Sequence, residues 1–247
     1  MTIIFLAILG AAVGSFLNVC IDRLPRRQSL LRPPSHCDSC RVPLRWTELL
    51  PIISFLALRG RCRSCHVSIP RRSPLVETIM AASFGLLVYY FGLGTQSAIF
   101  AFYIAIFTVI FFIDLEQGII PNRVIYPAAG VAVLLSFFLP EVGLLRALIG
   151  GILGLGLIFG VYLAARGGMG GGDVKLAGLI GLAAGFPAVV PSLLLACLGG
   201  GITASILLGL RRKRRKDPVP FGPFLAVGAL AGLLWGTQMV EVWMNLF

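Results

Sequence analysis

Two acidic residues stand at the ends of long apolar segments. Asp114 closes the segment that ends in IFFIDLEQGIIPN, and Asp173 follows a run of glycines in GGMGGGDVKL. If the two segments between them cross a membrane out and back, both aspartates lie on the same side of it. Two carboxylates that meet in a partly desolvated site share a proton, because both cannot ionise easily. Such a pair can activate water for attack on a peptide bond, as in aspartic proteases.

Asp173 also has a simpler interpretation. An aspartate just before an apolar helix is a favoured N-cap residue, and the residues alone do not decide between capping and acid–base chemistry. The glycines before it, Gly170 and Gly172 among them, can adopt backbone angles denied to other residues. We expect this bare backbone to leave room for an extended substrate strand.

The composition predicts the kind of element that positions these acids. A hydrophobic fraction of 57%, a mean hydropathy of +0.93 and only 13% charged residues exclude an ordinary water-soluble domain. We predict an all-α polytopic membrane protein of about eight transmembrane helices, near residues 2–20, 75–92, 97–114, 124–140, 144–165, 174–190, 192–210 and 220–240. Glycines four residues apart should let these helices pack closely, at Gly10/Gly14, Gly150/Gly154, Gly156/Gly160 and Gly181/Gly185.

The basic residues predict the orientation. With the loop after the first helix in the cytoplasm, 20 of the 21 lysines and arginines lie on the cytoplasmic side, and Arg146 is the exception. Both termini then lie outside. RRKRRK at 211–216 is expected to contact membrane lipids, so the net charge of +11 requires no nucleic-acid partner. Asp22 is expected to be solvated in a basic loop.

Four cysteines indicate a metal site. Cys37, Cys40, Cys62 and Cys65 form C-x2-C-x21-C-x2-C, a spacing typical of four-thiolate zinc. In a reducing cytosol, metal ligation is more plausible than disulfides, and a redox-active or metal-free loop is the alternative. The neighbouring His36 and His66 are expected to be bystanders.

The chain divides accordingly into three predicted parts. Residues 1–21 form the first transmembrane helix, 22–73 a small cytoplasmic basic Cys-rich loop domain, and 74–247 a membrane-embedded domain with both aspartates.

Seven sequence blocks together resemble one known family. They are GSFLNVCIDRLP at 14–25, the paired C-x-x-C loop, LRGRCRSC at 58–65, PLVE at 74–77, FFIDLEQGIIPN at 111–122, GMGGGDVKL at 168–176 and PFGPFLAVGA at 220–229. In this order they resemble the bacterial prepilin peptidases, or type IV leader peptidases, which are G-x-G-D intramembrane aspartyl proteases. Presenilin-type proteases share G-x-G-D but lack the Cys-rich loop and the last block.

The resemblance implies an activity and roles for residues. Asp114 and Asp173 would be the catalytic pair of a peptidase domain in the bacterial inner membrane that removes the short basic leader from prepilins and pseudopilins at the cytoplasmic face. Glu77 and Lys175 are candidate supporting residues, although Glu77 is equally well explained as a polar anchor of its helix. The oligomeric state and the particular pilin are left open.

The resemblance also implies a second activity. Family members with the Cys-rich loop N-methylate the new N-terminal residue with S-adenosylmethionine. This chain has Arg72-Ser73-Pro74 where the family has RYP, and ELLP at 48–51 where it has DNIP. No separate glycine loop for the methyl donor is found, so methyltransferase activity rests on resemblance alone.

Two other functions compete with this interpretation. A transporter or channel could use the paired aspartates to bind a cation, but it would predict inverted repeats and broken helices near the membrane midplane, which the sequence does not have. An inactive assembly scaffold is the other, and the intact aspartates argue against it.

Overall fold

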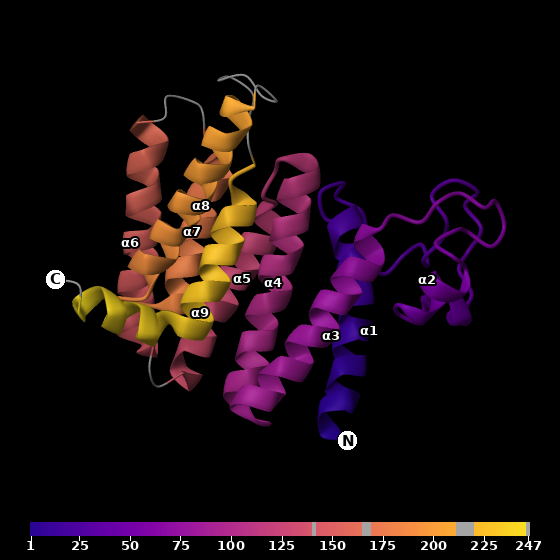
Figure 1. Ribbon diagram of the computed structural model, residues 1–247, viewed down its shortest axis with the longest axis horizontal. Helices are drawn as coiled ribbons and strands as arrows, with labels where there is room; N and C mark the ends of the chain where they lie inside the picture. The colour runs from indigo at the N-terminus through magenta and orange to yellow at the C-terminus, as the bar shows by residue number, and fades with distance from the viewer. Residues whose placement is uncertain (140–141, 165–168, 211–219, 246–247) are drawn as a thin grey trace. The chain divides into compact units, whose positions relative to one another are not determined.

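The computed structural model describes residues 1–139, 142–164, 169–210 and 220–245, without the side chain of Trp243 (Figure 1). The basic run at 211–216 lies outside the described residues. The chain forms two compact units, Met1–Ala105 and Ile106–Phe247, and the division falls within helix α4 (Thr95–Gln117). The three parts predicted from the sequence, 1–21, 22–73 and 74–247, have boundaries that differ from those of the two units, and this division stays a prediction.

The first unit is built on two helices that lie side by side, α1 (Thr2–Arg23) and α3 (Arg72–Phe91) (Figure 1). The long connection between them contains a short 3₁₀ helix, η1 (Trp46–Leu49), and one short helix, α2 (Ile53–Ala57). Close contact between α1 and α3 depends on glycine, because a Cβ atom at Gly14 would lie 2.7 Å from the Cα of Glu77. The predicted Gly10/Gly14 contact is therefore confirmed.

The second unit is a helical bundle around α7 (Gly171–Ala184). Nine of the 14 residues of α7 are buried, and it packs against α5, α6 and α9. The other elements are the end of α4, α5 (Asn122–Leu135), η2 (Ser136–Phe138), α6 (Gly143–Ala164), α8 (Val189–Gly209) and α9 (Gly222–Asn245). α9 bends at Trp235, whose φ of −129° and ψ of 19° are not helical, and its last turns run across the bundle (Figure 1).

The structure confirms the all-α fold of a multi-pass membrane protein. Each of the eight predicted spans coincides mainly with one α-helix, although 124–140 also includes η2 and 174–190 reaches the start of α8. Six of these helices are long and apolar enough to cross a membrane. The count of eight is supported only approximately, because α5 and α7 have 14 residues each. At about 1.5 Å per residue such a helix is about 21 Å long, shorter than the ~30 Å apolar core of a bilayer. Within the described residues, extended pairing is limited to two isolated bridges.

Glycines bring α6 and α7 into backbone contact. A Cβ atom at Gly150 would overlap the carbonyl oxygen of Gly181, and one at Gly185 would lie 2.8 Å from the Val142 side chain. The predicted contacts of Gly150/Gly154 and Gly181/Gly185 are therefore confirmed. The prediction for Gly156/Gly160 is wrong within the described part of the chain, because both residues are exposed on α6 and a Cβ atom at either would meet nothing there within 4 Å.

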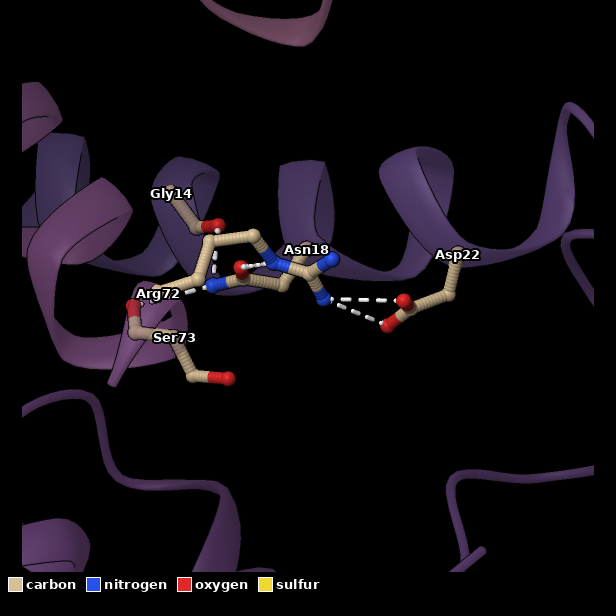
Figure 2. Close-up of polar contacts among 5 residues, drawn as sticks. All are labelled: Gly14, Asn18, Asp22, Arg72 and Ser73. Carbon is tan, nitrogen blue, oxygen red and sulfur yellow. Dashed lines mark hydrogen bonds and ion pairs between the residues drawn. The ribbon is translucent and has the colours of Figure 1, made fainter. Parts of the chain in front are cut away.

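A polar clamp of Asn18, Asp22, Arg72 and Ser73 joins the end of α1 to the start of α3 (Figure 2). The Asn18 amide donates to the carbonyl oxygens of Gly14 at 3.2 Å and Ser73 at 3.0 Å. Arg72 donates to both oxygens of Asp22, at 2.9 and 2.8 Å. Asp22 thus lies in α1 and is ion-paired, which corrects the expectation of a loop residue, whereas its side chain is 46% exposed and therefore solvated as expected.

The α6–α7 contact generates a stability prediction. Gly154→Ala should lower the free energy of unfolding by about 1–3 kcal/mol, because its Cβ would overlap the carbonyl oxygen of Ala177. Gly156→Ala, two residues along the same helix, is the matched control. It should be neutral or stabilising by up to about 1 kcal/mol, because it has open space and alanine favours helix. Thermal unfolding midpoints in detergent measure both, and equal midpoints for the two variants would contradict the close packing.

Candidate functional site

Asp114 lies near the end of α4 and is only 4% exposed. The backbone N–H of Gly222, the first residue of α9, donates to Asp114 Oδ2 at 2.9 Å. The first N–H groups of a helix have no acceptor within that helix, and its N-terminus carries a partial positive charge. Asp114 therefore supplies an acceptor for the start of α9, and α9 in turn stabilises a negative charge on Asp114.

Asp173 is the third residue of α7 and is 7% exposed. Its Oδ2 accepts a hydrogen bond from the Gly170 N–H at 3.2 Å, and Gly170 is the N-cap residue. The prediction that Asp173 could itself be the N-cap is wrong by one turn. The carboxylate folds back over the helix start instead, as in the acidic half of a capping box.

The two carboxylates lie near enough to interact electrostatically. The charge of Asp114 acts electrostatically on Asp173, and both side chains are almost excluded from solvent. Each accepts one backbone N–H at the start of a helix. This pair of buried, hydrogen-bonded and mutually interacting acids is the arrangement that can share a proton and activate a water molecule.

The glycines before Asp173 are explained by the lack of room for side chains more than by unusual backbone angles. Gly170 has φ −80° and ψ 142°, which any residue can adopt. A Cβ atom at Gly172 would lie 3.0 Å from the Cβ of Ile120, and one at Gly170 would lie 3.4 Å from Asp173 Oδ2. The expectation of special angles is therefore not met at Gly170, and the expected room for an extended substrate strand stays a prediction.

The two candidate supporting residues make contacts elsewhere. Lys175 Nζ donates to Asn122 Oδ1 at 3.0 Å and lies 5.5 Å from the centre of the Tyr126 ring, so it connects the starts of α7 and α5. Glu77 belongs to the other compact unit. It is 8% exposed and accepts the Ile52 N–H at 2.7 Å, which fixes the chain just before α2.

The four cysteines converge in the first unit. Their Sγ atoms all lie within 4.8 Å of one another, with 3.7 Å between Cys37 and Cys65 and 4.0 Å between Cys40 and Cys62. Four sulfurs at ~2.3 Å around a tetrahedral zinc ion would be ~3.8 Å apart, so the donor set fits such an ion. All six cysteines are free, and neither His36 nor His66 belongs to the cluster.

The two C-x-x-C turns have the same backbone hydrogen bonds. The N–H of Cys37 donates to Val42, and that of Cys62 donates to Val67. In each turn the residue after the second cysteine has a positive φ, 56° at Arg41 and 57° at His66. The N–H groups of Cys65 and Ser64 lower the pKa of the Cys62 thiol to about 7, which favours the thiolate that a metal requires.

Gly222 is a site residue to which the sequence analysis assigned no role. The block PFGPFLAVGA contains it, and a proline just inside the start of an apolar run is a signal for a helix N-terminus. That signal predicts where free N–H groups occur. It does not predict which distant side chain accepts from them.

Comparison with family models places two domains along the chain. The model described as the bacterial peptidase A24 N-terminal domain matches residues 8–91, and the type IV leader peptidase family model matches residues 101–205. No solved structure shows significant similarity to the chain.

Curated relatives match over nearly the whole length. Proteins named prepilin leader peptidase/N-methyltransferase are 30% identical in Pseudomonas aeruginosa, over 96% of this chain and 92% of the relative, and 32% identical in Burkholderia pseudomallei, over 96% and 86%. The protein of that name from Aeromonas salmonicida is 31% identical over 94% and 90%. With both family models matched in order and this coverage, the chain belongs to the type IV leader peptidase family.

Proposed function

We propose that this protein is a membrane aspartic endopeptidase that removes the short basic leader from type IV prepilins and pseudopilins. The observation that carries the proposal is the interacting pair of buried carboxylates, Asp114 and Asp173, each held by a backbone N–H group. The names of the relatives support the substrate class. A cation transporter is not favoured, because the chain belongs to a peptidase family.

The chemistry uses the two aspartates in different protonation states. The ionised carboxylate takes a proton from a water molecule while the water oxygen bonds to the carbon of the scissile carbonyl. The protonated carboxyl group donates its proton to the carbonyl oxygen, which gives a neutral tetrahedral diol. The aspartate that took the water proton then donates it to the amide nitrogen, while the other aspartate, now ionised, takes a proton from a hydroxyl of the diol. The C–N bond breaks, the leader is released with a carboxyl group that ionises in water, the new N-terminal amine is released, and both aspartates return to their starting protonation states.

The location of the reaction follows from the distribution of basic residues. The positive-inside bias supports a Cys-rich loop in the cytoplasm and both termini outside. Both aspartates then lie at the cytoplasmic ends of their helices, in the inner membrane of a bacterium. A basic leader that stays in the cytoplasm, followed by an apolar pilin helix in the membrane, would present its cleavage site at this depth.

The Cys-rich loop is proposed to hold one structural zinc ion. The spacing of the four Sγ atoms and the two matching C-x-x-C turns support a tetrathiolate site. N-methylation of the new N-terminus is proposed from the names of the relatives. S-adenosylmethionine would supply the methyl group for that reaction.

Asp114→Asn or Asp173→Asn should each reduce leader removal by at least about 100-fold, because an amide can neither accept the water proton nor share a proton with its partner. The measurement is cleavage of a prepilin by purified protein in detergent. Glu116→Gln, an exposed acid two residues from Asp114, is the control and should keep activity. Cleavage at the wild-type rate by either aspartate variant, with an unchanged unfolding midpoint, would contradict the catalytic pair.

Elemental analysis should find one zinc per chain in the native protein. The combination of Cys37→Ser and Cys62→Ser should remove it, because each C-x-x-C turn then loses a thiolate donor. Cys197→Ser, outside the cluster, should retain the metal. Native protein that carries no zinc after purification without chelators would refute the metal site.

Methyl transfer should be separable from proteolysis. Protein incubated with labelled S-adenosylmethionine and a pilin that already lacks its leader should label the N-terminal amine, and Asp173→Asn should do so at the wild-type rate. The reason is that the amine is the nucleophile in this step and no peptide bond is cleaved. Absence of label with wild-type protein would show that this chain is a peptidase alone.

A further inference from the structure

We propose that Gly222 is a positioning residue for Asp114. The backbone N–H of Gly222 orients the Asp114 carboxylate, and the absence of a side chain at Gly222 leaves the space that this carboxylate occupies. This inference rests on the proposed catalytic role of Asp114. It assigns a function to the start of α9, which the sequence analysis left without one.

The hydrogen bond gives the first reason. It joins the N–H of Gly222 to Asp114 Oδ2 at 2.9 Å, and both groups are buried. A short bond from a helix N-terminus to a buried carboxylate is charge-assisted, so it fixes the direction of the carboxylate more firmly than a solvated contact would.

The missing side chain gives the second reason. A Cβ atom at Gly222 would lie 2.6 Å from Asp114 Oδ2, 2.8 Å from its Cγ and 3.0 Å from its Cβ. Gly222 is not among the glycines with positive φ, so the backbone angle does not require a glycine there. The proximity of Asp114 requires a glycine, because any side chain at position 222 would displace the Asp114 carboxylate.

The flanking residues hold Gly222 in place. A Cβ atom at Gly200 would lie 2.9 Å from the ring of Phe221, and one at Gly199 would lie 3.3 Å from the ring of Phe224. Both rings therefore pack directly on the backbone of α8. These contacts hold the residues on both sides of Gly222 against α8, which is a different element from the α4 helix that carries Asp114.

The test compares two glycines of α9. Gly222→Ala should lower kcat for leader removal by at least about 10-fold and leave KM within about 2-fold, because its new methyl group displaces Asp114 and does not touch the substrate. Gly228→Ala is the matched control, since its Cβ would overlap the carbonyl oxygen of Ser192 in α8 and disturbs packing alone. It should lower the unfolding midpoint without this selective loss of kcat.

A second variant removes the hydrogen bond without adding a side chain. Glycolic acid incorporated in place of Gly222 replaces the N–H with an ester oxygen, and kcat should again fall by about 10-fold. Equal effects of Gly222→Ala and Gly228→Ala on kcat, or wild-type kcat for the ester, would overturn the inference. If Asp114→Asn is inactive in the same assay, the proposed function survives that result, whereas an active Asp114→Asn would overturn the proposed function itself.

Discussion

Two carboxylates are buried in an apolar bundle, and such groups are stable only where hydrogen bonds replace the lost water. Asp114 and Asp173 each obtain a bond from the first N–H groups of a helix, at Gly222 and Gly170. Those N–H groups need acceptors of their own, because the helix cannot provide them and lipid cannot either. One pair of contacts therefore satisfies the acids and two helix ends together.

This arrangement depends on how closely the helices approach. α7 is too short to span a bilayer alone, and it is mostly buried by its neighbours. Glycines at positions 150, 154 and 181 bring the backbone of α6 into contact with the second half of α7, from Ala177 onward. Asp173 lies near the start of α7, before this contact.

In the first unit, the long polar connection between α1 and α3 has few apolar contacts and is ordered mainly by polar ones. The polar clamp joins α1 and α3 where this connection begins and ends. Glu77 holds the middle of the connection through its hydrogen bond from the Ile52 N–H. A zinc ion held by the four thiols would provide a third constraint between its two turns. Asp114 and Asp173 both belong to the other unit. The contacts that order the connection between α1 and α3 are therefore separate from those that orient these two carboxylates.

The helical membrane fold, the positions of the eight main helices and the grouping of the four cysteines could be predicted from the amino-acid sequence, because apolar run length and C-x-x-C spacing are local properties. The sequence also made Asp114 and Asp173 candidates for the catalytic pair, from their places at the ends of such runs. Three features could be seen only in the folded chain: Gly222 donates to Asp114, Gly170 is the N-cap in place of Asp173, and Gly156 and Gly160 are exposed. These features depend on which helix face meets which neighbour, and contacts between residues as distant as 114 and 222 leave no signal in the spacing of either segment.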